Sequence, residues 1–297
     1  MAVSSVAARL SVVISTRDRP AELARTLGRL SALTPPPRIV VVDNASRGGL
    51  GWLYRHPSQP EVIALPRNLA AAARTVGAQQ VRTPYVAFSD DDSWWAPGAL
   101  PLAADMLDRH PRLGLLAGRT LVGPACRPDP VNHLLAASPL HSSDELPGRP
   151  VLGCLACACV VRRSAFLQMG GFHRVFEVGG EETLLCYDLA AAGWAVRYLP
   201  ELVAHHTPSP LRPVSWRRQA TDRRNELLVR WMRRPLPVAV AGTWELARSA
   251  VTDRVSRAAL TGLVRRLPAA LAGRHRLPAT VERDIRRLER FSLPPTG

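Results

Sequence analysis

Short runs of apolar residues alternate with amphipathic segments over about the first ninety residues of the chain. Residues 10–15 (LSVVIS) form a β-branched run, and Leu23, Leu27 and Leu30 then recur at helical spacing. Strands so uniformly apolar are typical of a parallel sheet that is covered on both faces. The pattern therefore predicts an open, doubly wound α/β sheet, which binds ligands beyond the carboxyl ends of its strands. The predicted strands are residues 10–15, 38–42, 62–65 and 84–88, and an Ala-rich helix is predicted at 68–81.

The pattern changes near residue 213. After Pro213 the sequence contains basic helical segments without clear strands. We therefore expect an α/β domain over residues 1–213 and a helical, Arg-rich C-terminal region over 214–297. Within the α/β domain the pattern further predicts a helix at 97–110, a strand at 113–121, a loop at 123–150, a strand at 151–161, helices at 162–169 and 181–192, and short strands at 196–199 and 202–204.

Polar residues follow three of the predicted strands where each strand ends. They are residues 16–19 (TRDR), residues 43–46 (DNAS) and the acidic run Asp90, Asp91 and Asp92. Adjacent carboxylates repel one another unless a cation is present, and carboxylate oxygens are the usual ligands of Mg²⁺ and Mn²⁺. The alternative is a helix N-terminus that carries acidic residues. One aspartate would serve for capping, so the run favours a divalent metal site that also takes substrate phosphates.

Six segments of the chain resemble family 2 glycosyltransferases, in the same order. They are SVVISTRDRP, VVDNAS, NLAAAARTVGAQQ, FSDDDSWWAPGAL, RRSAFLQMGGFHRVFEVGGEETLLCYDLAAAGW and VAHHTPSPLR, and together they cover about residues 8–212. The resemblance implies a GT-A fold, which is α/β, Rossmann-like and mainly parallel, with a nucleotide-sugar half over about 8–120 and an acceptor half over about 121–213. It also implies a metal-dependent, inverting transferase that moves a sugar from a nucleotide-diphospho sugar to an acceptor hydroxyl.

The resemblance implies roles for four residues in binding the donor nucleotide. Thr16 and Arg17 would lie in the first nucleotide-binding loop. Asp43 would accept a hydrogen bond from the donor's pyrimidine, and Arg74 would lie near the base or the diphosphate. The residues alone leave simpler interpretations open, because Asp43 can form an Asx turn and Arg74 can be a solvated helical side chain.

A metal site is implied for two of the aspartates and a histidine. Asp92 would coordinate the ion directly, and Asp90 would face either the ribose or the metal. In the family pattern a histidine after the last strand completes the metal shell. His205 is preferred because it stands two residues after Val203, and His206 stays open. Imidazole suits Mn²⁺ better than Mg²⁺, but the expected cofactor is either ion.

Two glutamates open the helix that follows Gly179 and Gly180, where the family usually has Glu-Asp. By position Glu182 would be the base that takes the proton from the acceptor hydroxyl. Glutamate is longer than aspartate by about one bond, so Glu181 could share or assume this role. The alternative is that both acids are simply favoured at a helix N-terminus.

Basic residues are concentrated in the last third of the chain. All 39 are arginine, and the net charge is +15. Residues 1–200 carry 20 Arg against 16 acidic residues, a balance of +4, whereas residues 201–297 carry 19 against 8, a balance of +11. Trp216, Trp231 and Trp244 lie among these arginines. This mixture suits either helices packed on the first domain or contact with an anionic membrane surface, and nucleic acid is unlikely as a partner because no nucleic-acid-binding signature is present.

Composition excludes several classes of protein. The chain is 46% hydrophobic and 21% charged, which excludes collagen-like, low-complexity and coiled-coil proteins. An odd number of cysteines, five, and the absence of a secretory pattern in the first twenty residues predict a cytoplasmic protein. The longest uncharged apolar run, residues 151–161, is far short of the roughly 20 residues that cross a bilayer. Any membrane contact would then be peripheral, on the inner face of the plasma membrane.

Cys154, Cys157 and Cys159 have a spacing that suggests zinc. Structural zinc needs four ligands, and no partner pair stands at a suitable spacing. Small buried thiols within a strand are therefore favoured over a zinc site.

Two alternatives to glycosyl transfer remain at this point. A nucleotidyltransferase could use the same acidic metal site, although the N-terminal part has no Gly-rich, basic triphosphate loop. The alternative that is not an enzyme is a sugar-nucleotide or nucleic-acid binding module. Metal-dependent turnover of a nucleotide sugar separates an enzyme from such a module.

Overall fold

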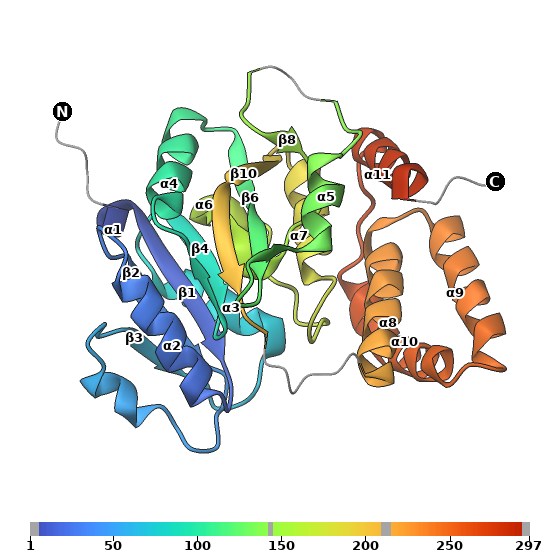
Figure 1. Cartoon of the computed structure of the whole chain (residues 1–297). Coiled ribbons are helices and arrows are strands. Elements are labelled where there is room, and N and C mark those ends of the chain that lie inside the picture. The colour runs from blue at the N-terminus through green and yellow to red at the C-terminus, as the bar shows by residue number, and fades with distance from the viewer. Residues whose placement is uncertain (1–5, 142–144, 209–214, 293–297) are drawn as a thin grey trace.

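A mixed sheet of ten strands forms the centre of the protein (Figure 1). The structure, a computed structural model, describes residues 6–141, 145–208 and 215–292. The strand order is β3-β2-β1-β4-β9-β6-β10-β5, with β7 paired to β6 and β8 paired to β10. The strands are β1 (Leu10–Thr16), β2 (Arg38–Asp43), β3 (Glu61–Ala64), β4 (Tyr85–Asp90), β5 (Ser93–Trp95), β6 (Leu113–Val122), β7 (Arg127–Pro128), β8 (Arg149–Pro150), β9 (Cys159–Arg162) and β10 (Ala195–His206).

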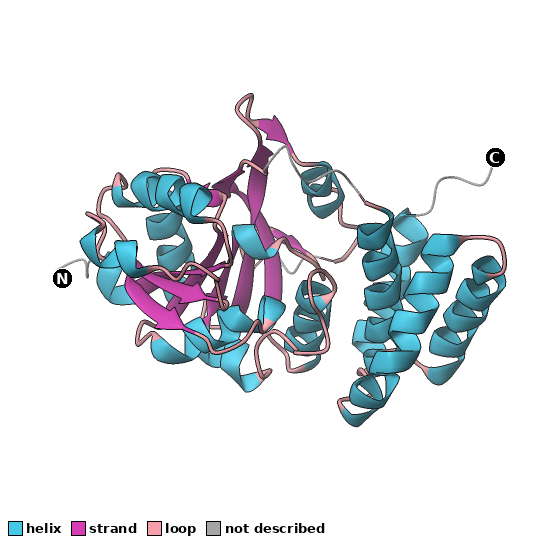
Figure 2. Cartoon of the chain, turned by 90° about the horizontal axis from the view of Figure 1, so that it is seen from below, coloured by secondary structure: helices cyan, strands magenta, loops and turns pink. Residues whose placement is uncertain are grey.

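Two apolar cores lie on opposite faces of this sheet (Figure 2). Side chains alternate along β1, so Val12 and Ile14 enter one core and Val13 enters the other. Helices α2 and α4 cover the first core, and α3, α6 and α7 cover the second. The protein is therefore a doubly wound α/β domain, as the sequence predicts. Its helices are α1 (Val6–Arg9), α2 (Pro20–Ser31), α3 (Ala73–Gln80), α4 (Ala99–Arg109), α5 (Pro130–Ala136), α6 (Arg163–Gln168) and α7 (Glu181–Ala191), with 3₁₀ segments at Gly51–Arg55, Ala70–Ala72 and Ala156–Ala158.

The register of the first strands brings the predicted polar residues to one edge of the sheet. β1 lies between β2 and β4 and is parallel to both. Thr16 is level with Asp43, and Ser15 is level with Asp90. The carboxyl ends of three strands therefore meet, and the chain turns there into the loops that can hold a ligand.

The second half of the sheet differs from the sequence prediction in three places. Residues 123–150, predicted as loop, contain α5, whose start is capped because the Asp129 carboxylate accepts a hydrogen bond from the Val131 amide. Residues 151–161 form a strand only from Cys159, because the Gly and Ala of this run have weak strand preference. The two strands predicted at 196–204 are one strand, β10, with an irregularity between Leu199 and Val203 that accommodates a proline.

The described part of the C-terminal region is helical and packs against α7. One apolar cluster joins Phe176 and Leu184 to α8, α9 and α10, and a second joins Tyr187 to α11. Asp188 of α7 and Arg233 of α8 form a buried ion pair across this contact, with Nε–Oδ1 at 2.5 Å. The helices are α8 (Trp216–Arg233), α9 (Leu236–Ala250), α10 (Arg254–Ala272) and α11 (Ala279–Ser292). Among the described residues, no helix is both long enough and apolar enough to span a bilayer.

Candidate active site

A cleft of about 720 Å³ opens at the carboxyl ends of β1, β2 and β4. This volume is within the usual range for small-molecule sites, about 300–1,000 Å³. The cleft combines residues from both halves of the α/β domain with one from α8. Its polar lining includes Thr16, Arg17, Arg19, Asn44, Arg74, Asp90, Asp91, Asp92, Glu181, Glu182, His206 and Arg218.

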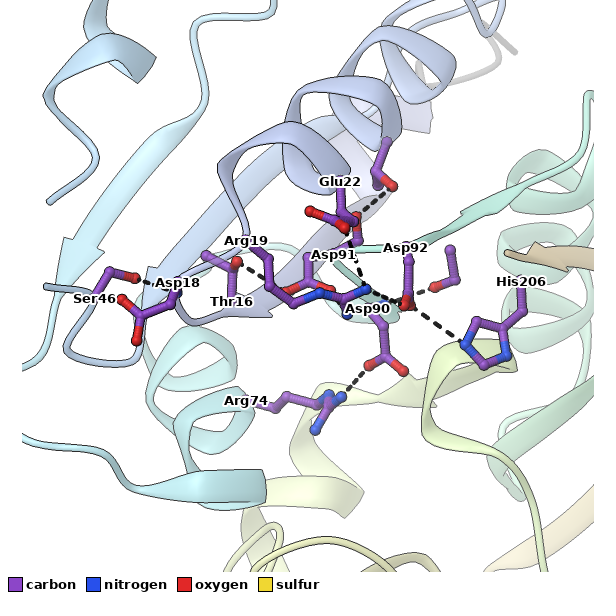
Figure 3. A network of polar contacts seen from close by, with 12 residues as sticks. Thr16, Asp18, Arg19, Glu22, Ser46, Arg74, Asp90, Asp91, Asp92 and His206 are labelled. Carbon is purple, nitrogen blue, oxygen red and sulfur yellow. Dashed lines mark hydrogen bonds and ion pairs between the residues drawn. The ribbon is translucent and has the colours of Figure 1, made fainter. Parts of the chain in front are cut away.

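The three aspartates after β4 have different partners (Figure 3). Asp90 is paired with Arg74 of α3. Asp91 accepts hydrogen bonds from the Thr16 hydroxyl at 3.0 Å and from Arg19 at 2.5 Å. Asp92 lies 2.8 Å from the other guanidinium nitrogen of Arg19. The arginine side chains thus offset part of the repulsion expected within the acidic run, although the charges of Asp90 and Asp92 still raise the pKa of Asp91.

His206, rather than His205, lies beside the aspartates. Its Nε2 is 3.3 Å from Oδ1 of Asp92. Asp90, Asp92 and His206 each offer one ligand atom, and these atoms lie within 4.8 Å of one another. Two carboxylates and an imidazole are a donor set that Mn²⁺ accepts, so the residues present fit a divalent ion.

His205 faces the opposite side of the β5–β10 pair. It stands level with Trp94, and the two rings stack with centroids 5.5 Å apart. Successive side chains of a strand point to opposite faces, so only one of the two neighbouring histidines can reach the cleft. His205 instead lines a separate hollow with Trp94 and Cys126. The histidine preferred from the sequence spacing is therefore not the one that the structure places near Asp92.

The environment shifts the pKa values of the neighbouring residues Asp91 and Asp92 in opposite directions. Burial raises the pKa of Asp91 to about 6 despite the nearby Arg19. Burial alone would also raise the pKa of Asp92, but hydrogen bonds from His206 and Arg19 outweigh it and leave that pKa lowered. Burial alone would lower the pKa of His206, but its hydrogen bond to Asp92 raises it overall. Asp92 is thus the carboxylate held most firmly in its charged form.

The donor-site residues predicted from the sequence are not all in the cleft. Thr16, Arg17 and Arg74 line it, and Arg17 is exposed. Asp43 is buried and is absent from the lining, and its carboxylate accepts a hydrogen bond from the Ser46 amide at 2.9 Å. That contact is the local turn that the sequence left open as an alternative for Asp43.

Asn44 lies in the cleft wall although the sequence analysis assigned it no role. Its Oδ1 accepts a hydrogen bond from the Leu69 amide at 2.7 Å, and its Nδ2 donates to the Ala70 carbonyl at 3.1 Å. Ala70 has a φ of +52°, a conformation that residues other than glycine rarely adopt. Asn44 therefore holds the loop that leads into α3 and Arg74.

Glu181 and Glu182 lie at the opposite wall, at the start of α7. Glu181 is 2% exposed, and its Oε2 has no hydrogen-bond partner among the described residues. Burial raises the pKa of both carboxyls, and the charge of Glu181 raises the pKa of Glu182 further. Raised pKa values at carboxyls in a cleft are typical of groups that exchange protons.

Helix α8 supports the loop in front of these glutamates. The side-chain amide of Asn225 donates hydrogen bonds to the carbonyls of Val178 at 3.0 Å and Gly179 at 2.5 Å. Gly180 has a φ of +90°, and a Cβ there would lie 3.1 Å from the Asn225 side chain. Arg218, also on α8, reaches the cleft itself. The C-terminal region is thus part of the site, which its basic composition alone did not indicate.

The cysteines do not form a metal site among the described residues. Cys157 and Cys159 are buried, and the group of potential metal ligands found in this part of the chain is Asp90, Asp92 and His206. Cys154 Sγ lies 4.0 Å from Cys186 Sγ of α7. Burial of small thiols, favoured over zinc from the sequence, agrees with this arrangement.

Sequence comparison places these elements in a known family. The profile described as Glycosyl transferase family 2 matches residues 11–170. A pre-mycofactocin glycosyltransferase of Mycobacterium tuberculosis is 34% identical over 217 residues, which cover 68% of this chain and 44% of that protein. An N-acetylglucosaminyl-diphospho-decaprenol L-rhamnosyltransferase of the same species is 28% identical, covering 66% of this chain and 76% of that protein. The chain therefore spans less than half the length of the first of these relatives.

Solved structures share the fold at low sequence identity. TarS 1–349 of S. aureus in complex with UDP-GlcNAc has a TM-score of 0.57 at 14% identity, covering 92% of this chain and 82% of that one. The mannosyltransferase PcManGT of Pyrobaculum calidifontis, in complex with GDP-Man and Mn²⁺, has a TM-score of 0.56 at 16% identity, covering 97% and 81%. The fold is GT-A, and because the family profile spans β1 to α6, including the acidic run after β4, this chain belongs to glycosyl transferase family 2.

Proposed function

We propose that this chain transfers a sugar from a nucleotide-diphospho sugar to an acceptor hydroxyl, with inversion at the anomeric carbon and dependence on a divalent cation. One observation carries the proposal: a group of metal-ligand atoms, from Asp90, Asp92 and His206, shares one cleft with two carboxyls, that of the buried Glu181 and that of the partly buried Glu182. Such a cleft has one wall suited to a diphosphate and another suited to removing a proton.

The donor nucleotide is proposed to lie along the β1 side of the cleft. Thr16 and Arg17 would border it, and the Arg74 guanidinium would contact the base or the diphosphate. Arg74 is paired with Asp90, and the charges of Asp90 and Glu181 raise its pKa although burial lowers it. A firmly charged guanidinium suits the recognition of phosphate oxygens. Asp43 would contribute to base recognition through its second carboxylate oxygen, because the Ser46 amide binds only Oδ1.

Asp90, Asp92 and His206 are the residues proposed to hold Mn²⁺ or Mg²⁺. When bound, the ion would supply positive charge that stabilises the diphosphate as it departs. The chain's own part is to keep Asp92 in the charged state that binds cations, whereas His206 must lose its proton before its Nε2 can bind the ion. Asp92 is held charged, and Arg19 fixes its position by contacting both Asp91 and Asp92.

Glu182 is proposed as the base, with Glu181 as its neighbour and possible substitute in that role. A base within hydrogen-bond reach of the acceptor hydroxyl typically contributes about 10² to 10⁴ in rate. The hydroxyl oxygen attacks the anomeric carbon as Glu182 takes its proton, and the bond to the diphosphate oxygen breaks on the opposite face. Attack and departure on opposite faces give inversion.

The C-terminal region bears on where the enzyme meets its acceptor. We propose that residues 214–297 hold the enzyme at an anionic membrane surface. Support comes from the balance of +11 over residues 201–297, where 19 Arg stand against 8 acidic residues. One relative is named for an acceptor linked to decaprenol through a diphosphate, which would present the acceptor sugar at such a surface.

Release of the nucleotide product tests this function. The full chain is incubated with a panel of nucleotide sugars, with Mn²⁺ or with EDTA, and the released nucleotide is identified. We expect nucleoside diphosphate, released only with the metal and lost in Asp92→Asn and Glu182→Gln, with His205→Ala as the matched active control. Release of pyrophosphate from a nucleoside triphosphate and a sugar phosphate, with no diphosphate released from nucleotide sugars, would indicate a nucleotidyltransferase. Binding without any turnover would indicate a non-catalytic module.

A further inference from the structure

Helix α9 has an unusual distribution of side chains between its two faces. Its inner face is built from small residues, including Ala239 and Gly242. A Cβ at Gly242 would lie 2.8 Å from the Leu227 side chain of α8, so the two helices approach too closely for a larger residue there. A helix that only completed a core would bury most of its large apolar side chains, but α9 buries three small residues, Ala239, Gly242 and Ala250, and one large one, Leu246.

Three large apolar side chains of α9 and Val251 at its end point outward, whereas Leu246 is buried. Leu236 is 51% exposed, Val240 53%, Trp244 66% and Val251, at the end of the helix, 77%. Their spacing places them within about 80° of one another around the helix and over a length of about 22 Å. These four residues, called the α9 stripe, are continuous along one face. Monomeric proteins rarely leave such a surface to water unless it binds something.

Arginines adjoin the C-terminal half of the α9 stripe. Arg248 is exposed one turn after Trp244. Arg257 places its guanidinium at the end of α9, where it donates to the Val251 carbonyl at 3.0 Å. Glu245 is the only acidic residue within Leu236–Ala250. An apolar stripe flanked by cations is complementary to an anionic lipid surface, where acyl chains take the stripe and headgroups take the guanidinium groups.

The position of α9 leaves this face accessible. Figure 1 shows α9 at the side of the helical region remote from the sheet. By contrast, Trp216 and Trp231 of α8 are only partly exposed, and Arg233 and Arg234 are buried in ion pairs. Arg233, Arg234 and the two tryptophans of α8 therefore serve the packing of the helices. The exposed large apolar residues of the helical region lie mainly on α9, with Val264, Leu271 and Phe291 on the helices that follow.

A second copy of the chain is a poorer partner for the α9 stripe. Two molecules that each carry a net charge of +15 repel one another. Stable protein interfaces also bury about 800 Å² on each partner, whereas large side chains bury at most about 150–250 Å² each. Four partly exposed residues do not reach that area. Binding to a lipid surface needs no minimum buried area, because its strength scales with the apolar area that enters the bilayer.

We infer that α9 is an interfacial helix, which docks the enzyme onto an anionic lipid bilayer through Leu236, Val240, Trp244 and Val251. This deepens the membrane contact proposed for residues 214–297. It is independent of whether the cleft transfers sugar, because vesicle binding requires neither donor nor metal ion.

Cosedimentation with vesicles tests the role of α9. The full chain is mixed with vesicles of phosphatidylcholine and phosphatidylglycerol in equal amounts, or of phosphatidylcholine alone. We expect binding to the anionic vesicles, weakened roughly tenfold or more in V240S/W244S. Arg248→Gln should weaken it about fivefold. The matched control is Y54S/L134S, which removes two side chains that are 79% and 52% exposed elsewhere and should bind as the native chain does.

The fluorescence of Trp244 also reports directly whether the α9 stripe reaches the acyl chains of the bilayer. It is the exposed tryptophan among the seven, all of which lie in the described ranges. Lipids with brominated acyl chains should therefore quench part of the native emission, and Trp244→Phe should remove that part while binding persists. Equal vesicle binding by V240S/W244S and the native chain would overturn the assignment to α9 while leaving a membrane contact elsewhere. No binding by the native chain, or a native dimer that V240S/W244S converts to a monomer, would overturn it as well.

Discussion

His206 Nε2 lies 3.3 Å from Asp92 Oδ1, where the end of β10 passes the turn that follows β4. This contact joins the last strand of the sheet to the acidic run more than a hundred residues earlier in the chain. It depends on the pairing of β5 with β10, in which His206 is level with Ser93. The register of β5 against β10 therefore determines that His206 lies beside Asp92 at the polar edge of the sheet.

The two neighbouring histidines should behave differently because they face opposite sides of β10. We expect His206→Ala to weaken Mn²⁺ binding roughly tenfold or more, as the loss of one of three ligands requires. His205→Ala removes an imidazole that stacks on Trp94 and should leave Mn²⁺ affinity unchanged. Titration of each variant with Mn²⁺ measures the affinity. An equal loss of Mn²⁺ affinity in both variants would show that His206 is not the metal ligand of the pair.

The pH dependence of transfer should report the interaction between the two glutamates. A base must be deprotonated, so the rate should fall as the pH drops through the raised pKa of Glu182. Burial is the largest cause of that raised pKa, and the charge of Glu181 adds to it. Glu181→Gln removes the charge and should move the acid limb of the kcat/KM profile to lower pH. Glu201→Gln, an exposed control, should leave the acid limb of the profile where it is. An unchanged profile in Glu181→Gln would show that the charge of Glu181 does not raise the pKa of the catalytic base.

The loop before α7 should depend on α8 through Asn225. Asn225→Ala leaves the carbonyls of Val178 and Gly179 without their side-chain donor. Both hydrogen bonds are only partly buried, so each one lost costs about 0.5–1.5 kcal/mol. We expect a loss of stability of that order in urea unfolding, together with a lower kcat because Glu182 is no longer held in place. Gln219→Ala, on an exposed position of the same helix, should change neither quantity.

The ion pair between Arg233 and Asp188 should be required for folding of the helical region. Both side chains are buried, and two hydrogen bonds of 2.5 and 2.8 Å join them. Arg233→Met would leave the buried Asp188 carboxylate with only the exposed His275 beside it, at 3.3 Å, and breaking a buried ion pair costs about 3–5 kcal/mol. Arg265→Gln, an exposed control, should lie within about 0.5 kcal/mol of the native chain. If Arg233→Met also changed the free energy of unfolding by no more than about 0.5 kcal/mol, the pair would not stabilise the helical region.

Much of the α/β part could be predicted because its signals are local. The apolar runs of β1, β2 and β4 and the polar residues that follow them stand directly in the sequence. Parallel pairing then places Thr16, Asp43 and Asp90 at one edge. The short helix α5 was missed because its start signal, Asp129 before a proline, stands in a stretch rich in Pro, Ser and His.

The rest of the site depends on contacts between distant segments. The choice between His205 and His206 follows from the register of β10 against β5, which residue spacing does not reveal. Arg19 and Asn44 act on Asp91 and Ala70 through tertiary contacts. The contribution of Arg218 depends on α8 packing beside α7. A capping signal could have found Asp129, but no local signal distinguishes these other residues.

Coupling between cation and nucleotide binding tests the central claim most directly. Calorimetric titration of the full chain with UDP and with GDP, in the presence and absence of Mn²⁺, measures that coupling. We predict that Mn²⁺ raises the affinity for at least one of them roughly tenfold or more, and that Asp92→Asn abolishes the increase while the protein stays folded. Equal affinities with and without Mn²⁺ for both nucleotides would contradict a metal-dependent donor site formed by Asp90, Asp92 and His206.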